Sequence, residues 1–234
     1  MTISSNVQKY LEKLEKSFKV FSQCHTLKDQ LFDYGWYPIK FVSRFEKDSN
    51  ETIDEFMERL ILKKYDQIKE YCFELFPLRK EVMEVAFKLY EAENYIACIP
   101  LFLTQTDGIA RDYGTKGMFS GRSNVEPNKS KFIPYVNQIA NQDLSKAIFI
   151  RFFHSEKFIG SKSYEELPIS IHTDNTTPND NYSMNRHGIL HGLIEYQNYG
   201  TKLNALRAIC FMVYTINIGE DVKFIFKSNN DIDH

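Results

Sequence analysis

The chain has 234 residues, of which 43% are hydrophobic and 15% aromatic, and its formal net charge at pH 7 is −2. That length suffices for one large or two small domains with a sizeable core. The near-zero charge excludes a basic surface over the whole protein, so any nucleic-acid contact must be local. No apolar run reaches membrane-spanning length and the first residues do not resemble a signal peptide, so we expect a soluble cytoplasmic protein with no membrane partner.

Four cysteines are scattered along the chain, each among apolar residues. This distribution is typical of buried free thiols in a reducing compartment, and it does not indicate a disulfide framework or a zinc knuckle. The cysteines are Cys24, Cys72, Cys98 and Cys210.

Residues 3–21 repeat apolar side chains in steps of three and four, with lysines and glutamates between them. This spacing predicts an amphipathic helix, which either packs on its own domain or binds a partner. Residues 31–45 combine many aromatic side chains with Gly35 and Pro38. We interpret them as a structural plug over a helical core, with at most one turn of helix; the alternative is that the aromatic and basic side chains stack on bases.

Two helices are predicted after the aromatic stretch. Thr52-Ile53-Asp54-Glu55 has capping-box spacing, and we expect the helix that it begins to end near Phe76, before Pro77. A second helix is expected from about Leu78 to Ala92. The residues predicted to face the core are Ile53, Phe56, Leu60, Ile68, Cys72 and Leu75 in the first helix, and Leu78, Val82, Val85, Ala86 and Leu89 in the second.

The stretch that follows is almost entirely apolar until Asp107, which is typical of a central helix buried on most sides. Pro100 lacks a backbone N–H, so this helix must start late or kink there. Two partners are open for the Asp107 carboxylate. It pairs with Arg111 four residues later, or it reaches across the bundle to orient Arg186 or His191.

Residues 114–130 are rich in glycine and mildly basic, without the spacing of a P-loop. We expect a surface loop; the alternative is a flap over substrate that uses Lys116, Arg122 or Lys129.

The second half of the chain continues the helical pattern. Two short helices are predicted over residues 132–158, and an apolar stripe after Gly200 predicts a core helix. Residues 222–227 alternate like a short strand. Since helices dominate, we expect an all-α helical bundle.

A polar loop that begins at His172 leads into the segment Asn185-Arg186-His187-Gly188-Ile189-Leu190-His191-Gly192. Asn185 is a good N-cap, which places Arg186 in the first turn of a helix. A helix N-terminus and a guanidinium together suit a phosphate. His187 and His191 add imidazoles, which titrate near neutral pH. An anion-binding group and a proton-transfer group are the minimum for cleaving RNA without a metal.

Other interpretations of the two histidines are open. His187 and His191 are four residues apart, a spacing that can bind zinc, but Gly188 rules out an HExxH motif and no nearby acid or cysteine completes a site. We therefore expect no metal and no cofactor. The simpler alternative is that both histidines are packed side chains of a helix and have no chemical role. Arg186 and His191 lie roughly 140° apart around a straight helix, so they would flank a groove without stacking.

The arginine, four intervening residues and a histidine resemble the signature of HEPN domains, named for nucleotide binding in higher eukaryotes and prokaryotes. The segment from Tyr90 to Pro100, followed by the acid at Asp107, looks like the core helix pair of that family. The motif, with residues 199–204 after it, is also similar to a group of largely uncharacterised bacterial proteins that carry this bundle at the C-terminal end.

The resemblance covers residues 78–217, where we expect the HEPN-like bundle. Residues 1–77 are expected to form an additional N-terminal helical region packed on this core, and residues 218–234 a short strand or a frayed tail.

Active HEPN proteins are metal-independent endoribonucleases, commonly of toxin–antitoxin, abortive-infection or other antiviral systems. The resemblance implies a homodimer whose two motifs face each other, RNA as substrate, and an antitoxin or regulatory protein as a further partner. By the same resemblance, Arg186 holds the scissile phosphate and His191 moves a proton. Asn185 and His187 orient nearby groups, and Asp107 tunes Arg186 or His191.

Inactive members of the family keep the fold and bind nucleotides or partners, so a non-catalytic binding module is the alternative function. The near-zero charge favours that alternative, and the presence of both Arg186 and His191 favours the enzyme. A purely structural helical adaptor is a third interpretation.

Overall fold

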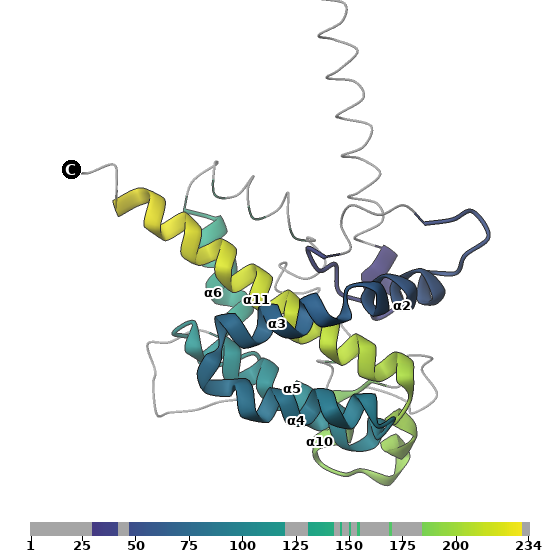
Figure 1. Ribbon diagram of the computed structural model, residues 1–234. Coiled ribbons are helices and arrows are strands. Elements are labelled where there is room, and N and C mark those ends of the chain that lie inside the picture. The colour runs from purple at the N-terminus through teal and green to yellow at the C-terminus, as the bar shows by residue number, and fades with distance from the viewer. Residues whose placement is uncertain are drawn as a thin grey trace, which may run out of the picture.

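The chain is described by a computed structural model, which covers residues 30–41, 47–119, 131–142 and 184–230 and the single residues 146, 150, 154 and 169, with side chains up to Phe224. Every regular element in these residues is a helix, so the fold is all-α (Figure 1). The elements are α2 (Ile53–Lys63), α3 (Tyr65–Leu75), η1 (Pro77–Arg79), α4 (Lys80–Glu91), α5 (Tyr95–Asp112), α6 (Phe132–Ala140), α10 (Arg186–Leu190), η3 (Ile194–Tyr199) and α11 (Lys202–Asn230), where η marks a 3-10 helix.

The centre of the bundle is α11, which runs diagonally across the molecule in Figure 1. Residues 204–219 of this helix are all buried, so it has no polar stripe. Its most extensive contact is with α5. The sequence predicted α5 as the central helix, but Ile96, Thr104 and Arg111 on α5 are exposed. The predicted core helix after Gly200 is confirmed, and it takes the central position.

The aromatic stretch before α2 forms part of the core. Trp36, Tyr37 and Ile39 are buried, and the Tyr37 ring lies 4.5 Å from the ring of Phe211 on α11. The plug interpretation is therefore confirmed for residues 31–41, and the same buried cluster includes side chains of α2 to α6 and α11.

The capping box at the start of α2 is also confirmed. Glu55 N donates to Thr52 Oγ1 at 3.2 Å, and Thr52 N donates to Glu55 Oε2 at 2.8 Å. The single predicted helix is wrong, however, because α2 ends at Lys63 and α3 begins at Tyr65. No glycine or proline marks this break. Leu75, predicted to face inward, is exposed at the end of α3.

On α4 the predicted core face is largely wrong. The helix buries Met83, Ala86, Phe87 and Tyr90, while Leu78, Val82 and Val85 are exposed. The helix has two apolar faces, and the one with large aromatic rings is buried. The Phe87 ring contacts those of Tyr65, Phe73 and Phe102 from α3 and α5, so burial of aromatic area decides the orientation.

The predicted strand at residues 222–227 is wrong, because α11 continues through them to Asn230. The Tyr113 hydroxyl donates to the carbonyl of Ile216 at 3.2 Å, and its ring lies so close to Gly219 that a Cβ there would clash. The Lys223 ammonium also lies over this ring, 4.7 Å from its centroid, so α11 packs on Tyr113 as far as Lys223.

The first of the two helices predicted over residues 132–158 is confirmed as α6.

Three of the cysteines, Cys72, Cys98 and Cys210, are buried free thiols. Burial raises the pKa of the Cys72 thiol to about 12, which keeps it protonated and unreactive. Several features discussed from the sequence lie outside the described residues. They are the predicted helix at 3–21, Cys24, most of the glycine-rich loop and the polar loop after His172.

Candidate functional site at the Arg186–His191 turn

The motif forms one short helix, α10, with Asn185 as its N-cap. The buried Asn185 side chain accepts a hydrogen bond from Gly188 N at 2.9 Å, so the predicted cap is confirmed. A Cβ at Gly188 would lie 2.2 Å from the ring of Tyr196, so glycine allows η3 to fold back onto α10. The turn ends at once, since His191 is the C-cap.

Two aromatic rings contact the Arg186 guanidinium. Its Cζ lies 4.4 Å from the centroid of the Phe119 ring, within the range of a cation–π interaction. Its Nη2 also contacts Nε2 of His187. A guanidinium can only donate, so His187 Nε2 is the acceptor in this contact. Arg186 remains partly exposed.

The two histidine rings lie nearly parallel. The centroids of His187 and His191 are 6.0 Å apart with an interplanar angle of 13°. His187 is half-buried and His191 is exposed. The sequence predicted that Arg186 and His191 flank a groove. In the structure the His187 ring contacts the guanidinium of Arg186 and lies nearly parallel to the ring of the exposed His191. The three side chains, called here the Arg–His row, are thus linked through His187.

Asp107 lies next to this row but contacts other groups. Its Oδ2 accepts from Arg111 Nε at 3.0 Å, which is the simpler of the two predicted pairings. Its Oδ1 accepts from Phe119 N at 2.8 Å. Gly117, at φ +102°, packs against the carboxylate so closely that a Cβ would lie 2.6 Å from Oδ1. Asp107 therefore holds the turn that positions Phe119, and the Phe119 ring packs against the Arg186 guanidinium.

A proline on α5 anchors the other end of the motif segment. Pro100 has no N–H, so the carbonyl of Ile96 loses its helical donor. The Tyr199 hydroxyl donates to that carbonyl at 3.0 Å. Next to it, Gly200 packs directly on Ile96. On the α11 side, Asn204 Nδ2 donates to the carbonyl of Tyr199 at 2.9 Å. Pro100 lies inside α5, which runs from Tyr95 to Asp112, so the helix does not start late as the sequence allowed. The hydrogen bond that Pro100 removes leaves the carbonyl at which Tyr199 docks.

One expectation from the sequence, the phosphate contact at a helix N-terminus, is changed by this geometry. At five residues, α10 is too short to offer a strong helix dipole, and Asn185 already accepts the Gly188 N–H, so the phosphate contact would depend on side chains. In the described part of the chain, no three His, Cys, Asp or Glu side chains come together as metal ligands. In the same part, no helix is long and apolar enough to cross a bilayer.

Leu190, Leu193 and Ile194, which lie close to His191 in sequence, are exposed, as is Glu195 beside them.

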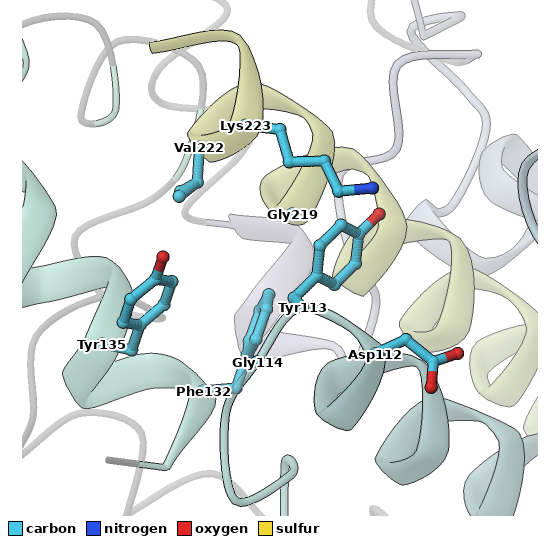
Figure 2. Close-up of a pocket in the computed structure, with 8 residues that line it drawn as sticks. All are labelled: Asp112, Tyr113, Gly114, Phe132, Tyr135, Gly219, Val222 and Lys223. Carbon is cyan, nitrogen blue, oxygen red and sulfur yellow. The ribbon is translucent and has the colours of Figure 1, made fainter. Parts of the chain in front are cut away.

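A cavity of about 280 Å³ lies elsewhere, where α5, α6 and α11 meet (Figure 2). Its charged groups are already paired: Lys223 Nζ bonds Glu220 at 3.0 Å, and Asp112 bonds Arg79. None of its lining residues belongs to the motif. They are Asp112, Tyr113, Gly114, Phe132, Tyr135, Gly219, Val222 and Lys223.

Sequence reasoning missed Phe119, Tyr196 and Tyr199 as supports of the motif. The only local signal was Pro100. Because proline has no N–H, the carbonyl of Ile96 four residues earlier needs a donor from elsewhere in the fold. The pairing of Phe119 with Arg186 spans 67 positions (186 − 119) and has no sequence signature.

No model of a known protein family matches this chain, and neither do the curated proteins or the solved structures with which it was compared. The resemblance of residues 186–191 to a family motif therefore rests on the sequence alone.

Proposed function

We propose that the protein is a metal-independent endoribonuclease of HEPN type. The observation that carries the proposal is the Arg–His row, in which Arg186, His187 and His191 follow one another from a partly buried guanidinium to an exposed imidazole. Cleavage of RNA without a metal requires a cation beside the scissile phosphate and a group that moves a proton, and this row brings both together.

In the proposed reaction the RNA 2′-hydroxyl attacks the adjacent phosphorus and the 5′-oxygen leaves, which produces a 2′,3′-cyclic phosphate and a 5′-hydroxyl. Arg186 stabilises the charge that develops on the phosphate oxygens. His191 exchanges a proton with the attacking or the leaving oxygen. His187 and Asn185 hold the turn in shape, and Asp107 acts through Phe119 on the position of the guanidinium.

RNA is the proposed substrate, and a bacterial defence, toxin–antitoxin or stress response is the proposed setting, with an antitoxin or regulatory protein that covers the row. The near-neutral charge fits a small local site better than long-range capture of RNA.

The test is incubation of the purified protein with structured and single-stranded RNA in EDTA, beside Arg186→Ala and His191→Ala. We expect cleavage by the wild type, strong loss in both variants, and products with 2′,3′-cyclic phosphate ends. Arg59→Ala is the matched control, because Arg59 is an exposed arginine over the Phe56 ring on α2, outside the motif. It should cleave as the wild type does.

Absence of cleavage by the wild type, or equal cleavage by all four proteins, would contradict the proposal. Saturable nucleotide binding without turnover, lost in Arg186→Ala, would instead establish the non-catalytic binding module.

A further inference from the structure

An apolar stripe runs along the outer surface of η1 and α4. Leu78 is 101% exposed, Val85 48% and Val82 42%, and the half-buried Leu89 continues the line. Their spacing of four, three and four residues places them on one side of a helix. α4 and its neighbours α3 and α5 already have a filled core of aromatic rings on the opposite side. The stripe is therefore a second apolar face, and no element of the described part of the chain buries it.

The spacing of the stripe is that of the core positions in a two-helix coiled coil. When two such helices pack antiparallel about a two-fold axis, each core position faces a different core position of the partner. Placing the axis between Val82 and Val85 sets Val82 against Val85 of the partner subunit. The same axis sets Leu78 against Leu89 of the partner subunit. The stripe is thus complementary in shape to a second copy of itself.

The charges beside the stripe are also self-complementary. Glu81 and Lys88 are both exposed and lie on the solvent side of the stripe, seven residues apart. In the antiparallel arrangement Glu81 lies across from Lys88 of the partner subunit, and Lys88 lies across from Glu81 of the partner subunit. Glu81 makes no ion pair within the described part of the chain. Lys88 has only an exposed contact with Glu84 at 3.2 Å, which leaves its side chain 68% exposed.

We propose that this stripe is an interface between two copies of the chain, in which α4 packs antiparallel on α4. The self-complementary charges favour a second copy over an unrelated helix as the occupant. The inference is independent of the proposed enzyme activity, and the interface contains none of the motif residues. It differs in this from the family resemblance, which implies a dimer with facing motifs.

The size of the interface sets its strength. α4 has 12 residues and is about 18 Å long, so the contact is small beside the roughly 1,200 Å² of a standard stable interface. The dimer should therefore be reversible and dependent on concentration.

The test is sedimentation equilibrium of the full chain over two decades of concentration. The wild type should shift from monomer to dimer. Glu81→Lys and Lys88→Glu each place like charges opposite one another twice per dimer, so each should raise the dissociation constant roughly tenfold. The double variant Glu81→Lys with Lys88→Glu restores opposite charges and should return the dissociation constant to within about threefold of the wild type.

A second variant pair tests the apolar part. Val85→Asp buries a charge in the interface and should abolish the dimer. Leu62→Asp on α2 is the control: Leu62 is 41% exposed, a fraction similar to that of Val82, but it lies outside the stripe. It should leave dimerisation unchanged.

Circular dichroism of each variant confirms that it is folded. A wild type that stays monomeric at every concentration overturns the proposal. So does a dimer that survives Val85→Asp, or a double variant that remains as weak as the single ones.

Discussion

Two arginines of this protein lie over aromatic rings in different surroundings. Arg207 is buried on α11 with its Cζ 5.1 Å from the ring of Trp36, and its guanidinium donates to Asp54 at 2.9 Å and to Asn204 at 3.1 Å. Arg186 lies partly exposed over Phe119 and contacts a second ring, that of His187.

The comparison shows that a similar cation–π contact occurs at a buried, neutralised arginine and at a partly exposed one. At Arg207 the Asp54 carboxylate neutralises the charge and the Asn204 side chain fixes the orientation of the guanidinium. These contacts join α2, the aromatic stretch before it and α11. At Arg186 the rings set the orientation of the guanidinium while part of it faces solvent. An arginine of the first kind is part of the core, and one of the second kind leaves part of its guanidinium open to the anion that the proposed function requires.

The largest expected difference is in activity. Arg186→Ala should reduce RNA cleavage by roughly 100- to 1,000-fold, as expected for loss of a group that stabilises transition-state charge. Its urea midpoint should stay close to that of the wild type, because the side chain is partly exposed. Single-turnover cleavage rates and urea unfolding check both parts. A large loss of stability together with the loss of activity would place Arg186 in the structural class with Arg207.

Arg207→Met should show the reverse behaviour. The substitution keeps the apolar stem but removes the hydrogen bonds to Asp54 and Asn204, and it should lower the free energy of unfolding by about 2–3 kcal/mol. Cleavage per folded molecule should not change. The measurement is urea unfolding followed by Trp36 fluorescence. Arg59→Met, on an exposed arginine with a surface partner, is the control and should unfold close to the wild type.

Phe119→Leu tests the ring beneath Arg186. The change keeps an apolar side chain but removes the cation–π contact, so cleavage should fall roughly fivefold. Phe41→Leu is the control, because Phe41 is another partly buried ring, 5.3 Å from Tyr71, with no role in the Arg–His row. Equal cleavage by both variants would show that the ring does not position Arg186.

Tyr199→Phe should lower the free energy of unfolding by about 1 kcal/mol, because the Ile96 carbonyl loses its donor. In a Pro100→Ala background the same change should have little effect, since the substituted alanine supplies the missing backbone N–H. A double-mutant cycle measured by urea unfolding gives the coupling. A coupling near zero would mean that Tyr199 does not replace the bond lost at Pro100.

The smallest effect concerns pH and the buried carboxylate of Asp221. Burial by itself would raise its pKa, but hydrogen bonds from His154 and Lys40 outweigh burial and lower it. A pKa lowered by folding adds stability above the unfolded value, near pH 4, and this is lost as the pH falls through the folded value. Urea midpoints should therefore fall more steeply below pH 4 in the wild type than in Asp221→Asn. Parallel curves would contradict this.

The local features of this protein were determined by the sequence alone. The capping box at Thr52, the cap at Asn185 and the core helix after Gly200 each depend on contacts within one or two helical turns, so their patterns can be read directly. The all-α class could be predicted because helical patterns of this local kind recur along most of the chain. The contiguity of Arg186 with His187 and His191 is local for the same reason.

The tertiary structure decided what depends on competition between distant groups. α4 carries two apolar faces, and only the aromatic rings of α3 and α5 determine that Phe87 is buried and Val85 exposed. Asp107 had several cations within plausible reach, and the turn at Gly117 directs it to Phe119 N. Residues 222–227 alternate like a strand, yet they continue α11, which packs on Tyr113 at Gly219 and Lys223. In each case the sequence allows more than one local arrangement, and the free energy of burial and hydrogen bonding across the bundle selects one.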